Sequence, residues 1–223
     1  MLPRRFQGLI PYIQKGNDPK LLLISGMHGD EFGSIDLLQA YLQENNDKLP
    51  DYLYIPEFSP SAVHNKTRKN FKGVDINRSF FKNSDDQEVQ DNISLLSNRH
   101  FDLCLDFHED TSFSKEFYLY DSGQMDVHDQ EVLRQAILDC GALSYVGVDD
   151  LDDPTLRYHV SAGYTSTPLA TLDEKSGFFW TWGLKNKIIK RIFDIECPTK
   201  GDRELKKRLI SMSFGFLLRY YRP

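Results

Sequence analysis

The strongest constraint on the fold of this chain is the alternation of short apolar strands with amphipathic helices. The run Leu-Leu-Leu-Ile-Ser at 21–25 is ended by a glycine, which is typical of a buried strand. Further strands are predicted at 53–58, 101–107, 116–120 and 190–195, and helices at 31–45, 131–143 and along the apolar face from Leu205 to Tyr220. This order predicts an α/β fold, a three-layer α/β/α sandwich with a mixed, mainly parallel twisted sheet.

The stretch 122–190 carries many glycine and proline breakers. We expect loops that border the site and one helix there, not a second domain. A length of 223 residues fits one α/β enzyme core, so residues 1–223 are expected to form a single catalytic domain.

Charge and cysteine content limit the partners and the compartment. A net charge of −6 argues against nucleic acid as the main partner, although one local arginine can still bind a small anion. No apolar run is long enough to span a membrane, and no apolar stretch follows the N-terminal arginines as in a signal peptide. Three cysteines without paired spacing favour reduced thiols and a cytoplasmic location.

Two short motifs at strand ends contain residue types that bind metals. His28 and Glu31 lie three apart on a glycine-containing turn that follows the first buried strand, so an imidazole and a carboxylate can reach one ion. Alone, this motif also fits a surface turn with a helix-starting acid. His108 ends a second apolar strand and would be a third ligand, with Asp106 placed to orient an imidazole from behind.

A third motif spans 67–80, where Arg68 and the pair Asn77 and Arg78 flank a glycine-containing turn. Arginine side chains match carboxylates bidentately, although charge alone would also fit a solvated basic loop. His-Gly-Asp-Glu, Arg-Lys-Asn, Gly-Val-Asp-Ile-Asn-Arg-Ser-Phe and Asp-Phe-His, in this order, resemble the zinc carboxypeptidase superfamily. The resemblance covers positions 28–196. That superfamily includes the succinylglutamate desuccinylase and aspartoacylase branch and the bacterial murein-peptide amidases.

The resemblance implies a role for each matching residue. His28, Glu31 and His108 match the ligands of one zinc ion per chain. Arg68 matches the arginine that polarises the scissile carbonyl, and Asn77 and Arg78 match the pair that binds the free carboxylate of the substrate.

The general base of the family is a glutamate on a late strand, and two candidates exist. Glu196 is preferred because Pro198 and a long helix follow it, as in the family pattern. Glu174, in the segment Thr-Leu-Asp-Glu, is the rival. Asp194 stands where the family often has threonine, and it shares a strand face with Glu196, so it is expected to shape the substrate pocket.

Other departures bear on the substrate. Ser59 precedes Pro60 where the family often has asparagine, and the tyrosine that closes over substrate has only Tyr158 and Tyr164 as possible matches. We expect no C-terminal β-domain like that of aspartoacylase after the core. The expected function is therefore hydrolysis of an amide bond in a small peptide with a free carboxylate, and the alternative is deacylation of an N-acyl amino acid. A silent binding module would need a broken ligand set.

Overall fold

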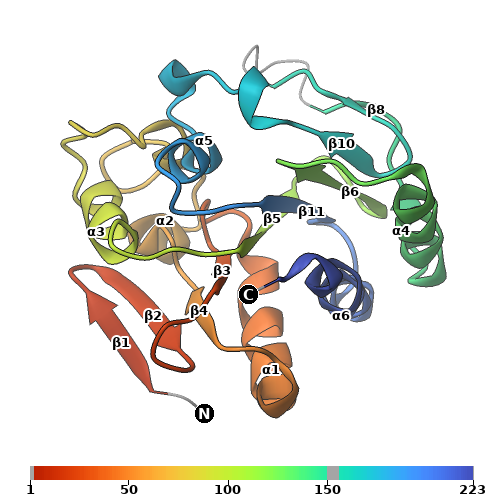
Figure 1. The fold of residues 1–223 in the computed structure, drawn as a ribbon, viewed down its shortest axis with the longest axis horizontal. Helices are drawn as coiled ribbons and strands as arrows, with labels where there is room; N and C mark the ends of the chain where they lie inside the picture. Colours follow the sequence, from red (N-terminus) through yellow and green to blue (C-terminus); the bar gives the residue numbers. More distant parts are fainter. Residues whose placement is uncertain (1–2, 150–155, 223) are drawn as a thin grey trace.

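The apolar run at 21–25 is a fully buried strand at the centre of the sheet in the computed structural model, which describes residues 3–149 and 156–222 (Figure 1). The main sheet has the strand order β1-β2-β4-β3-β5-β11-β6-β10, and β7 pairs with β6. Its strands are β1 (Arg4–Gln7), β2 (Ile10–Gln14), β3 (Leu21–Ser25), β4 (Tyr52–Ile55), β5 (Leu103–Asp110), β6 (Glu116–Asp121), β7 (Leu143–Ser144), β10 (Tyr164–Ser166) and β11 (Ile192–Pro198). A separate two-stranded sheet pairs β8 (Gly147–Val148) with β9 (His159–Val160).

The four central strands, β4, β3, β5 and β11, run parallel to one another. The β1–β2, β2–β4 and β11–β6 pairs are antiparallel, so the sheet is mixed and mainly parallel at its centre. This confirms the predicted fold class. Parallel neighbours end at the same edge of the sheet, and ligands of such folds bind there.

Helices cover both faces of the sheet (Figure 1). One face packs against α1 (Ile35–Asn45), α4 (Val127–Asp139) and α6 (Arg203–Leu217), and the other against α3 (Gln87–Leu96) and α5 (Phe179–Lys185). Along β3, Leu21 and Leu23 face the first group, and Leu22 and Ile24 face the second. A central strand with both faces covered therefore needs a continuous apolar run rather than an alternating one.

The remaining helical segments are short. The helix α2 (Pro60–Asn65) is joined to α3 because Glu88 accepts hydrogen bonds from the Ser59 hydroxyl and the Ser61 backbone N–H. The 3-10 helices are η1 (Phe32–Ser34), η2 (Asn46–Lys48), η3 (Ile76–Arg78), η4 (Leu169–Thr171), η5 (Glu174–Ser176) and η6 (Leu218–Tyr220). Within the described ranges, no helix combines the length and apolar character that a membrane span requires.

Several predicted boundaries are wrong by a few residues, and some elements were not predicted. The helix expected at 131–143 begins at Val127, because the Asp126 side chain caps it by accepting a hydrogen bond from the Asp129 backbone N–H. The helix expected from 31 begins as a 3-10 turn, and α1 starts only at Ile35. The stretch 122–190 contains α5 as a second helix, and the β1–β2 hairpin has no counterpart among the predicted elements.

Candidate metal and catalytic site

The candidate metal ligands and the preferred base come from three central strands whose carboxyl ends share one edge of the sheet. His28 and Glu31 follow β3, His108 lies near the end of β5, and Glu196 lies near the end of β11. In the parallel β5–β11 pair, Glu196 is the register partner of His108. The sheet thus brings together residues that are up to 168 positions apart in the sequence.

The turn after β3 places His28 and Glu31 because glycines allow its backbone to bend tightly. Gly26 has a φ of +64°, which favours a residue without a side chain. A Cβ on Gly29 would lie 1.8 Å from the backbone carbonyl oxygen of Ala62, so no larger residue fits there without moving α2. The glycines in this motif are therefore needed by the geometry of the turn.

Three side chains form a compact donor set at this edge. The Nδ1 atom of His28 lies 2.6 Å from Oε1 of Glu31, and Nδ1 of His108 lies 2.8 Å from Oε2 of the same carboxylate. The ligand atoms of all three lie within 4.8 Å of one another, and each residue is at most 6% exposed. Two imidazole nitrogens and one carboxylate are a donor set that fits a catalytic zinc ion.

The outer nitrogens of the two imidazoles face further carboxylates. Nε2 of His28 lies 3.3 Å from Oδ1 of Asp75, and Nε2 of His108 lies 3.5 Å from Asp106 and 3.7 Å from Asp194. Carboxylates behind ligand imidazoles fix the ring orientation and raise its basicity. The sequence identified Asp106 for this position but missed Asp75, which lies two residues before Asn77 in the third motif.

The electrostatics of the site also favour a cation. Burial alone would lower the pKa of His108, but Asp194, Asp106 and Glu31 outweigh it, and the pKa lies well above its ordinary value. Burial alone would raise the pKa of Glu31, but the two histidines hold it well below its ordinary value. Burial raises the pKa of Asp194 to about 7. Metal binding would release protons from this site, because a ligand imidazole must be neutral and a ligand carboxylate must be ionised.

A cavity of about 530 Å³ opens beside the donor set. Glu31, Arg68 and Glu196 line it together. Asp75 holds Arg68, because its Oδ2 accepts a hydrogen bond from Nε of Arg68 at 3.1 Å. The Nη1 atom of Arg68 lies 3.8 Å from Oε1 of Glu31. The candidate metal ligand, the candidate base and one guanidinium therefore share a single hollow.

The other predicted substrate residues lie outside the described lining of this cavity. The guanidinium of Arg78 stacks on the ring of Phe178 at 3.8 Å. The Asn77 side chain accepts a hydrogen bond from the backbone N–H of Phe179, so it holds the start of α5. Asp194 lies behind His108. The structure does not bring Asn77, Arg78 and Asp194 together at the cavity wall, and their roles in substrate binding stay predictions.

The rival base Glu174 belongs to a different part of the fold. Its backbone begins η5, and its neighbours Asp173 and Lys175 line a separate hollow of about 320 Å³. Of the described residues that line that hollow, none is a candidate metal ligand. The choice of Glu196 over Glu174 as the base stays a prediction.

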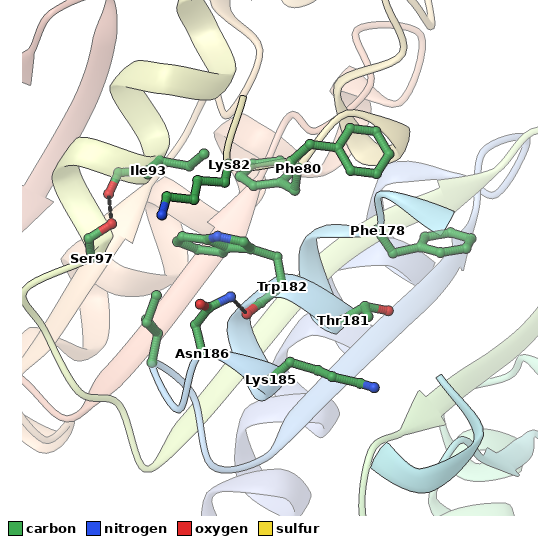
Figure 2. Close-up of a pocket in the computed structure, with 11 residues that line it drawn as sticks. Phe80, Lys82, Ile93, Ser97, Phe178, Thr181, Trp182, Lys185 and Asn186 are labelled. Atoms are coloured by element: carbon green, nitrogen blue, oxygen red, sulfur yellow. Dashed lines mark hydrogen bonds between the residues drawn. The ribbon is translucent and has the colours of Figure 1, made fainter. Parts of the chain in front are cut away.

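The larger hollow in Figure 2, of about 690 Å³, lies elsewhere on the molecule. Aromatic rings such as those of Phe80 and Trp182 line it beside Lys82 and Lys185. Among its described lining residues there is no His, Asp or Glu. Cavity size alone therefore does not locate the chemistry in this chain.

The tyrosines near the site differ from those named from the sequence. Tyr164 is buried, and its hydroxyl donates to Asp121, so its role is structural. Tyr158 lines the separate hollow beside η5. The candidate cavity is instead lined by Tyr118, Tyr120 and Tyr145, which sequence reasoning missed because two of them looked like ordinary strand residues.

The fold and the site define an α/β protein in which side chains of the kind that bind a metal ion lie together at the carboxyl ends of the parallel strands. The sequence model of the succinylglutamate desuccinylase/aspartoacylase catalytic domain matches residues 17–145. This match covers more than half of the 223 residues, so the chain belongs to that family. No curated protein matches the sequence.

Solved structures with the same fold carry hydrolase names. A "putative metallopeptidase" from Shewanella amazonensis superposes with a TM-score of 0.76 at 19% identity, over 100% of this chain and 88% of the other. A metallo-carboxypeptidase from Burkholderia cenocepacia gives 0.64 at 13% identity, over 95% and 60%. A succinylglutamate desuccinylase from Silicibacter sp. TM1040 gives 0.54 at 16% identity, over 95% and 60%. At these identities the likeness shows the fold, and with the family match it makes the chain a hydrolase.

Proposed function

We propose that this chain is a zinc-dependent hydrolase that cleaves an amide or peptide bond next to a free carboxylate. One observation carries the proposal: the side chains of His28, Glu31 and His108 meet within 4.8 Å, and Glu196 is the strand partner of His108. These three ligands would hold one zinc ion. When bound, the ion would lower the pKa of a coordinated water and polarise the carbonyl group of the substrate.

The residues of the chain supply the remaining chemistry. Glu196 would accept the proton of the attacking water and later deliver it to the leaving nitrogen. Burial holds the pKa of Glu196 well above its ordinary value, so this carboxylate takes up a proton more readily than an exposed glutamate does. Arg68 lines the same cavity and would stabilise the negative charge that develops on the carbonyl oxygen.

A second candidate is an N-acyl-amino-acid deacylase with the same ligands and base. The family match favours it, because the names of that family describe the removal of acyl groups from amino acids. The two functions differ only in the substrate. They differ in whether its acyl half or its amine half is the larger one, and in which of these halves fits the cavity. The organisation of residues 1–223 as one catalytic domain and a cytoplasmic location also stay predictions.

One experiment tests the proposal. The purified chain is stripped with a chelator, titrated with zinc, and assayed on short peptides and on N-acyl amino acids. We expect one zinc per chain and hydrolysis that depends on it. His108→Ala should lose the zinc, and His64→Ala, which removes an exposed histidine on α2, should keep it. Equal zinc content in both variants would contradict the ligand assignment, and inactivity on every substrate would contradict the proposed reaction.

A further inference from the structure

A buried ion pair adjoins the donor set. Lys206 comes from α6, and its Nζ lies 2.9 Å from Oε2 of Glu109, the residue that follows the candidate ligand His108 on β5. Lys206 is 7% exposed and Glu109 is 2% exposed. Within the described ranges no other lysine is buried. Two opposite charges have therefore been taken out of water beside a candidate metal ligand.

Apolar packing alone would not require a charge at position 206. Its neighbours on α6, Leu205, Leu209 and Ile210, are buried in the core. Replacement of a whole buried ion pair by apolar residues of similar volume is often neutral or stabilising, because the desolvation of both charges is avoided. Stability therefore does not explain the pair, and its contacts indicate what it holds in place.

The ion pair lies between the two segments that carry the candidate ligands. Glu109 lies at the end of β5, and Gly33 lies in η1, two residues after Glu31. A Cβ on Gly33 would lie 2.6 Å from Nζ of Lys206 and 2.9 Å from Oε1 of Glu109, so η1 packs against both charged groups. The ion pair therefore limits how closely η1 approaches the end of β5.

A hydrogen bond joins the same two segments. The backbone N–H of Glu109 donates to Oε2 of Glu31 at 3.2 Å, and the same oxygen lies 2.8 Å from Nδ1 of His108. Hydrogen bonds to a ligand carboxylate fix its orientation toward the metal. Glu109 is thus anchored to α6 through its side chain and to Glu31 through its backbone.

We propose that Lys206 is a positioning residue for the metal site. Through Glu109 and Gly33 it holds Glu31 at the spacing from His108 that one zinc ion requires. This inference rests on the proposed function and adds to it a residue outside the described lining of the cavity. Lys206 would contact neither the ion nor the substrate, and it would act only through the segments that carry the ligands.

A charge-neutral variant separates positioning from electrostatics. Glu109→Gln combined with Lys206→Met removes one negative and one positive charge, so the net charge around the site is unchanged. Both partners are removed together, so most of the fold stability should remain. Zinc affinity is measured by competition with a chelator, and the visible spectrum of the cobalt-loaded chain reports the ligand geometry. We expect zinc binding to weaken by about 10–100-fold and the cobalt spectrum to change.

Gly33→Ala perturbs the same contact without changing any charge. The added Cβ would displace the ion pair, so zinc binding should weaken by about tenfold. This variant keeps the test decisive if the double variant does not fold. Gly215→Ala is the matched control on α6, because a Cβ there would meet no described atom within 4 Å beyond the backbone of its own helix. It should leave zinc binding unchanged.

A second control separates positioning from general destabilisation. Arg191→Met removes the ion-pair partner of the buried Asp121, which pairs with Phe193 near the start of β11, at the opposite edge of the sheet. This variant should melt at a lower temperature than wild type and bind zinc with unchanged affinity.

The outcomes are distinct. Wild-type zinc affinity with an unchanged cobalt spectrum, in either the double variant or Gly33→Ala, would overturn the positioning role. An equal loss of zinc affinity in Arg191→Met would also overturn it, because destabilisation would then explain the effect. Zinc binding that weakens as expected, in a chain whose wild type hydrolyses no amide, would refute the proposed function and support the positioning role.

Discussion

Replacement of Glu196 by glutamine gives the sharpest test of the site. The substitution keeps the shape of the side chain and removes the group that accepts a proton. Glu196 lies on β11 between β5 and β6 and faces the cavity that Glu31 and Arg68 also line. A general base contributes about 10²–10⁴-fold to the rate, which corresponds to about 2.7–5.4 kcal/mol in activation free energy. We expect kcat to fall by that factor and the zinc content to stay at one per chain.

The structure also predicts how the same variant changes stability. Burial raises the pKa of Glu196 well above its ordinary value, Asp194 adds to this, and His108 offsets only part of it. A group that binds its proton more tightly in the fold makes the protein less stable as pH rises through its unfolded pKa of about 4.3. Metal-free Glu196→Gln lacks this loss, so it should melt at a higher temperature than metal-free wild type above that pH. The difference should fade below it.

The measurement must be paired with the rival residue. Steady-state rates, zinc content and melting temperatures are compared for wild type, Glu196→Gln and Glu174→Gln. The assignment is refuted if Glu174→Gln abolishes turnover while Glu196→Gln keeps kcat within about threefold of wild type. Loss of the general base must lower the rate by far more than threefold.

Four further predictions concern the site and the residues around it. His108→Ala should reduce bound zinc from one per chain to nearly none, as measured by elemental analysis after dialysis, because it removes one of three ligands. Arg68→Ala should lower kcat about 10²-fold; Arg78→Ala should instead raise KM for a carboxylate substrate, and an unchanged KM would exclude it as the anchor. Lys206→Met should destabilise the fold by about 3–5 kcal/mol in urea unfolding, because it leaves Glu109 buried without its partner, and adding Glu109→Gln should recover most of the loss.

The parts of the site that the sequence predicted are those that depend on local pattern. An apolar run before His28 and another before His108 identify two strands, and parallel strands must end at one edge of the sheet. The convergence of these residues, together with Glu31, follows from that rule alone. The structure confirms the fold class for the same reason.

The parts that the sequence missed depend on long-range pairing. Nothing local to β11 shows that it lies between β5 and β6 and runs antiparallel to β6. Without that register, Tyr118 and Tyr120 look like ordinary residues of a buried strand, and their place beside Glu196 cannot be seen. The role of Asp75 was hidden in the same way, because only the fold shows that it lies behind His28.

Two unpredicted elements have a different cause. The strand β1 is exposed along its whole length and shows no apolar period, so it forms by pairing with β2 rather than by burying a face. The helix α5 contains Phe179, Trp180 and Trp182, which are weak helix formers, and it is held by aromatic packing against Phe58 and Phe80. Tertiary contacts therefore decide both elements.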